Sequence, residues 1–101
     1  MERKALTDNS GQWFDIETAE VFEESMEWNG NNNISCATGS QWEHEKLHRT
    51  ASGKWVLNWW SQMQGSLESW TEVSDEEAAR WLVRNGEESD IVSDEIADLE
   101  L

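Results

Sequence analysis

The residues best suited to metal chemistry lie in one short segment of the chain. Glu43, His44 and Glu45 are followed by His48, and histidines four positions apart can hold zinc when they share one face of a helix. The surrounding residues instead favour a strand over 44–50, where positions 44 and 48 share one face. A third ligand would have to come from elsewhere in the chain. We therefore interpret the segment as a polar strand, and we expect neither a metal nor a cofactor.

Nucleophilic catalysis finds little support in the single cysteine. Cys36 with His44 or His48 would supply a thiol and a base, but no glycine-rich elbow surrounds the cysteine and no helix begins directly after it. The 22 carboxylates contain many conceivable acid–base pairs, and no spacing distinguishes one of them. We expect a non-enzymatic protein and keep an enzyme as the third hypothesis.

The chain contains eight tryptophans, five of them within residues 55–81. Indole rings can stack on bases or sugars. A nucleic-acid channel also needs basic residues along the backbone path, whereas residues 42–86 hold five bases against seven acids. A small-ligand or carbohydrate site is the better alternative, with Trp60 and Trp70 as the partly exposed rings. Most tryptophans are expected in the core, including Trp55, Trp59 and Trp81.

Acidic residues dominate the two ends of the chain. The net charge is −15, with eight acids and two bases in residues 1–41 and seven acids without a base in residues 87–101. Such a surface repels nucleic acid and anionic membranes, and it attracts basic partners over long distances. The simpler explanation is that the acidity only keeps a tryptophan-rich chain soluble.

Local signals predict the elements that position these side chains. Ser74 and Glu77 form a capping box for a helix at about 75–85, which Asn85-Gly86 ends. Residues 44–50, 55–62 and 67–73 read as three strands joined by short turns. Apolar residues at helical spacing over 18–26 predict a short acidic N-terminal helix. The expected fold class is α+β, an antiparallel meander of three or four strands packed by these two helices.

The composition further predicts one compact domain over residues 1–86 and a flexible acidic tail over residues 87–101. Cys36 has no second cysteine to pair with, which favours a reducing compartment. The first residues contain no apolar run of signal-peptide length, and no stretch reaches membrane-span length. These features predict a cytoplasmic protein.

Several segments carry a resemblance to a known group of proteins. They are Trp28-Asn29-Gly30-Asn31-Asn32, the run from Ala37 to Glu45, Trp59-Trp60-Ser61-Gln62 with Gln64-Gly65-Ser66, and Glu76 to Asn85. In these segments the chain resembles a family of short uncharacterised bacterial proteins, over about residues 11–86. The resemblance implies a bacterial or mobile-element origin and no particular activity.

The leading functional hypothesis is a non-enzymatic acidic module that binds a basic protein. In its sharpest form the module mimics nucleic acid and occupies a nucleic-acid-binding groove, as antirestriction and anti-CRISPR proteins do. Carboxylates imitate a phosphate array only when many share one face, and on the expected N-terminal helix four of them run along one side. The expected contact residues are these four acids and two tryptophans: Glu17, Glu20, Glu24, Glu27, Trp60 and Trp70.

Overall fold

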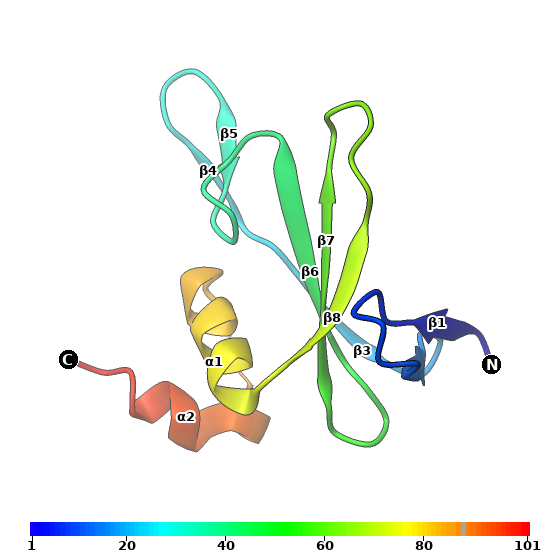
Figure 1. Ribbon diagram of the computed structural model, residues 1–101. Coiled ribbons are helices and arrows are strands. Elements are labelled where there is room, and N and C mark those ends of the chain that lie inside the picture. The colour runs from blue at the N-terminus through cyan, green and yellow to red at the C-terminus, as the bar shows by residue number, and fades with distance from the viewer. Residues whose placement is uncertain (88) are drawn as a thin grey trace.

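The computed structural model describes residues 1–87 and 89–101, which form eight strands in three antiparallel sheets and a few short helical segments (Figure 1). The elements are β1 (Arg3–Ala5), β2 (Trp13–Asp15), β3 (Glu20–Glu23), β4 (Met26–Trp28), β5 (Asn33–Ser35), β6 (Glu43–Arg49), β7 (Trp55–Ser61), β8 (Ser69–Val73), α1 (Asp75–Arg84), the 3-10 helix η1 (Asp90–Val92) and α2 (Ser93–Ala97).

The predicted α+β class is wrong, because the protein is mostly β. The error lies chiefly in the N-terminal third, where residues 18–26 contain strands β3 and β4 in place of a helix. Strand β3 pairs with β6, which sets Phe22 opposite Leu47 and Glu23 opposite Lys46. Pairing with a distant strand therefore overrides the local helical spacing of the apolar residues.

A four-stranded sheet in the order β3-β6-β7-β8 forms the centre of the molecule. Its three later strands lie where the sequence predicts strands, and their aromatic and β-branched residues suit a sheet buried on both faces. Gly53 has φ of 89° in the β6–β7 turn, and its N–H donates to Thr50 O at 2.9 Å. A Cβ on Gly53 would also approach Arg49 Nη2 to 3.2 Å, but that flexible side chain can move, so the positive φ is what favours glycine here.

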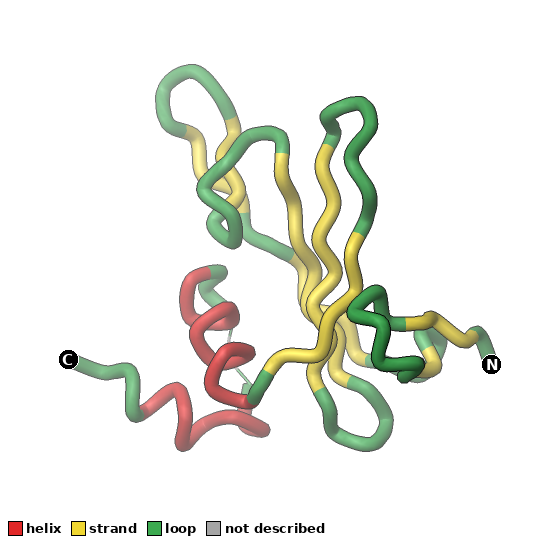
Figure 2. Tube along the Cα trace, in the orientation of Figure 1, coloured by secondary structure: helices red, strands yellow, loops and turns green. Residues whose placement is uncertain are grey.

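Helices cover one face of this sheet, as Figure 2 shows. The predicted helix at 75–85 is present as α1, and Ser74 Oγ accepts the Glu77 N–H at 3.1 Å as its N-cap. The core on this face unites β3, β6, β7, α1 and η1, and these residues form it: Phe22, Leu47, Trp55, Ala78, Ala79, Trp81, Leu82 and Val92.

The β1–β2 hairpin covers the opposite face, so the N-terminus and the helical layer lie on opposite sides of the sheet (Figure 1). Phe14 from β2 packs there with Val56 and Trp70. Thr7 fixes the hairpin to β8, because its N–H donates to Trp70 O at 2.8 Å and its Oγ1 accepts the Trp70 N–H at 2.8 Å.

The last residues contact the helical side of the core. Val92 is 1% exposed, and Ile96 packs against the same cluster. The division into a compact domain over residues 1–86 and a flexible tail over residues 87–101 stays a prediction. No helix among the described residues is both long enough and apolar enough to cross a bilayer.

Candidate functional site

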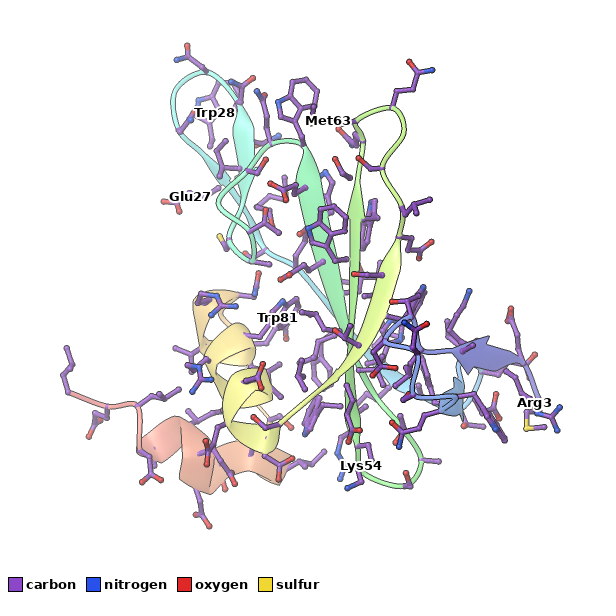
Figure 3. The ribbon with its side chains drawn as sticks, viewed as in Figure 1. Arg3, Glu27, Trp28, Lys54, Met63 and Trp81 are labelled. Carbon is purple, nitrogen blue, oxygen red and sulfur yellow. The ribbon has the colours of Figure 1, made fainter. Side chains whose placement is uncertain are left out.

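The four acids expected on one helix lie in four different settings. Glu17 is in the turn after β2, where its carboxylate lies 3.1 Å from the N-terminal amine, and Glu20 is on the edge strand β3. Glu27 is on β4 and points away from the sheet (Figure 3). These three side chains are exposed, whereas the side chain of Glu24 is only 11% exposed. Because the helix is absent, the regular row of carboxylates is absent too.

Glu24 is instead a buried connector between strands. One carboxylate oxygen contacts His44 Nδ1, and the other accepts hydrogen bonds from Ser35 Oγ and from the Glu45 N–H, the latter at 3.0 Å. These contacts join the end of β3 to β5 and β6. Hydrogen bonds to a charged acceptor are stronger than neutral ones, so Glu24 stabilises the junction of the small β4–β5 hairpin with the main sheet.

The same residues do not form a nucleophile–base pair. Catalysis by Ser35 would require a base on its hydroxyl, but this hydroxyl donates to Glu24, which lies between it and His44. Ser35 is fully buried, and the ring of Trp60 stacks on His44 at a centroid distance of 5.6 Å. A substrate could not reach these side chains, so we interpret the cluster as structural.

Trp60 and Trp70 differ in their exposure. Trp60 is half-buried beside His44, while Trp70 is 7% exposed within the hairpin-side core. The tryptophans that face solvent are others, with exposed fractions of 62% for Trp28, 50% for Trp13 and 49% for Trp42. Of the three tryptophans expected in the core, Trp55 and Trp81 are buried, and Trp59 is half-buried.

Basic side chains contact tryptophan rings more often than they form ion pairs with carboxylates. Cation–ring distances are 4.9 Å for Arg3 on Trp13, 4.9 Å for Lys4 on Trp70, 5.8 Å for Lys46 on Trp60 and 5.9 Å for Arg49 on Trp55. Among the described residues, Lys46 is the one lysine or arginine in an ion pair, at 3.7 Å from Glu23. The bases thus leave most of the surface carboxylates uncompensated. Cation–π packing of this kind has no simple sequence signal.

Two titratable groups in the sheet are shifted in opposite directions. Burial raises the pKa of Glu45, and the Trp81 indole, which donates to this carboxylate at 3.0 Å, partly offsets the rise. Burial lowers the pKa of His48, whose ring lies 5.7 Å from Phe14 and 5.2 Å from Trp70. Within the described chain neither ring nitrogen of His48 has a hydrogen-bond partner.

The histidines of β6 do not gather a metal-binding set. His44 and His48 share one face of the strand, as expected, but the first is bonded to Glu24 and the second is enclosed by aromatic rings. Within residues 1–87 and 89–101, no three His, Cys, Asp or Glu side chains are grouped so that they could hold a metal ion.

Comparison with known proteins adds no relative. No protein-family model matches the chain, and neither the curated proteins nor the solved structures give a match. The resemblance noted in the sequence therefore gains no support from them, and function has to be argued from the geometry.

Proposed function

We propose that this protein is a non-enzymatic acidic module that binds a basic protein. In its sharpest form it mimics nucleic acid and blocks a nucleic-acid-binding groove, in the manner of antirestriction and anti-CRISPR proteins. The observation that carries the proposal is the placement of charge. Four basic side chains lie on tryptophan rings, and Lys46 is the one lysine or arginine of the described residues in an ion pair, so most of the 22 acids have no basic side chain beside them.

The proposed contact surface follows the β3 edge and the hairpin beside it. Glu20 is exposed on β3, Glu17 and Glu27 are exposed before and after it along the chain, and β3 has β6 on one side alone in the sheet. Glu24 is a positioning residue on this surface, because its three contacts join the end of β3 to β5 and β6. Rigid positioning matters because a carboxylate array can imitate phosphates only when its spacing is fixed.

The single cysteine supports a cytoplasmic setting for this activity. Cys36 is a free thiol, and the chain holds no second cysteine. The net charge of −15 opposes direct contact with nucleic acid or with anionic lipid, which leaves basic proteins as the favoured partners.

The test begins with capture of the partner from a bacterial lysate at low salt. Association with the purified partner should then slow as ionic strength rises, because salt screens the attraction between exposed charges. Glu20→Lys combined with Glu27→Lys should weaken binding and leave the melting temperature nearly unchanged, since both side chains are exposed.

Two controls separate this surface from charge in general. Asp98→Lys combined with Glu100→Lys makes the same charge change at exposed positions near the C-terminus and should weaken binding much less. Glu24→Ala should lower stability, which distinguishes a positioning role from direct contact. Binding that resists both salt and the Glu20/Glu27 reversal would refute the proposal.

A further inference from the structure

A pocket of about 550 Å³ lies where the β1–β2 hairpin meets the β6–β7 turn and the main sheet. Phe14 and Val56 give it apolar walls, and Lys54 contributes from the turn, where Figure 3 labels it. The volume falls within the range of about 300–1,000 Å³ that small-molecule sites occupy. The pocket shares none of the carboxylates assigned above to partner binding.

Trp13 is among the residues that line the pocket, and its side chain is 50% exposed. The Arg3 guanidinium lies 4.9 Å from the ring centroid and holds the indole in place. An indole combines a flat apolar surface with a polar N–H, which suits the C–H face of a sugar ring. The sequence predicted Trp60 and Trp70 as the partly exposed rings of a carbohydrate site, and neither of these lines this pocket.

The polar groups of the pocket include both acceptors and donors. Asp15 and Glu72 contribute carboxylates, Lys54 an ammonium group and Thr18 a hydroxyl. Asp15 is held by the backbone, because its Oδ1 accepts the N–H groups of Glu2 and Glu17, each at 3.1 Å. Lys54 and Glu72 take part in none of the ion pairs of the described chain, which leaves them available to a ligand.

We propose that this pocket binds a neutral saccharide. Each sugar hydroxyl both donates and accepts hydrogen bonds, so it can use the carboxylates and the ammonium group together. An anionic ligand would face two carboxylates, and the place of a cation on the Trp13 ring is already taken by Arg3. This activity is independent of the acidic surface, and because the ligand carries no charge its affinity is insensitive to salt.

The experiment is a titration of the full chain with four neutral disaccharides, followed by ¹H–¹⁵N NMR. The disaccharides are cellobiose, maltose, lactose and N,N′-diacetylchitobiose. The expected result is that one of them shifts the Trp13 indole signal and the amides of residues 50–54, with equal affinity at low and high salt. Trp13→Ala should weaken this binding by at least about tenfold, which corresponds to about 1.4 kcal/mol. Glu72→Gln, on the rigid strand β8, should weaken it independently of the hairpin.

A matched control is Trp28→Ala, which removes a tryptophan that is 62% exposed and lies outside the pocket. It should bind the disaccharide as the unmodified chain does. The proposal is overturned if none of the sugars shifts these signals at about 10 mM, a concentration that nearly fills a site with a dissociation constant of about 1 mM. It is equally overturned if both Trp13→Ala and Glu72→Gln retain full affinity, or if N-acetylarginine amide or inorganic phosphate binds the pocket more tightly than every sugar.

Discussion

The two faces of the four-stranded sheet are built differently, although the same strands supply both. On the helical face, α1 and η1 close a continuous cluster around Leu47 and Trp55, whose exposed fractions are 0% and 1%. On the hairpin face, a smaller cluster surrounds the unpartnered imidazole of His48 and borders an open pocket. The difference shows how a small domain can concentrate its stability on one face and leave the other free to hold a cavity.

The largest effect is expected from Trp55→Ala on the helical face. Removal of a buried indole leaves a cavity, and the free energy of unfolding should fall by about 3–5 kcal/mol. Chemical denaturation measures this change. Trp28→Ala, on the exposed hairpin, is the control and should change stability by less than about 0.5 kcal/mol. If the Trp55 variant is as stable as its control, the helical face does not supply most of the stability of the domain.

A smaller effect is expected from Val92→Ala in η1. Val92 is 1% exposed in the helical cluster, so the loss of two methyl groups should lower stability by about 1–3 kcal/mol. Ile91→Ala is the matched control, because the neighbouring side chain is 48% exposed. Equal melting temperatures for the two variants would instead support a flexible tail over residues 87–101 that contributes nothing to the core.

These contrasts also explain how much the sequence could predict. Helix α1 is specified locally, since Ser74 caps its start and Gly86, with φ of 68°, follows its end. The strands β6, β7 and β8 are joined by short connections, and aromatic and β-branched residues in them favour strands. In contrast, β3 is a strand only because β6 pairs with it, and the local spacing around Phe22 points to a helix.

The candidate sites were harder to predict for the same reason. The buried setting of Glu24 depends on Ser35 and His44, which lie 11 and 20 residues away in the chain. The pocket at Trp13 joins β2 to the β6–β7 turn and to β8, so no segment of the sequence contains its pattern. Charge and composition predicted the acidic character of the surface, but which carboxylates are exposed depends on these long-range contacts.

His48→Leu probes the weaker packing of the hairpin face. Burial lowers the pKa of His48, with Lys46 acting in the same direction and Glu23 opposing it. The folded protein therefore favours the neutral ring, and its stability should fall as the pH drops below the ordinary value of 6.5. The apolar variant lacks this loss, and at pH 5 it should be more stable than the unmodified chain by about 1 kcal/mol.

Denaturation at pH 7 and at pH 5 measures the difference for His48→Leu. Phe14→Leu is the control, since it alters the same cluster and keeps the imidazole, so its dependence on pH should match that of the unmodified chain. An equal loss of stability in the His48→Leu variant would show that some other group produces the acid sensitivity.

The smallest effect is expected from Glu45→Gln on the helical face, and its sign should be opposite. Burial raises the pKa of Glu45, so the folded state favours the protonated acid; this contribution is complete below the ordinary value of 4.5 and is lost as the pH rises through the raised pKa. An amide oxygen can still accept the Trp81 indole N–H, now without a charge to desolvate. At pH 7 the variant should be as stable as the unmodified chain, or more stable by less than about 1 kcal/mol, because the side chain is only half-buried and Arg84 already favours the carboxylate.

At pH 4 the Glu45→Gln variant and the unmodified chain should be equally stable, and Glu43→Gln controls for loss of a charge on the same strand. A variant that is clearly less stable at pH 7 would mean that the charged carboxylate holds Trp81 in place, and the two faces would then no longer respond to pH in opposite directions.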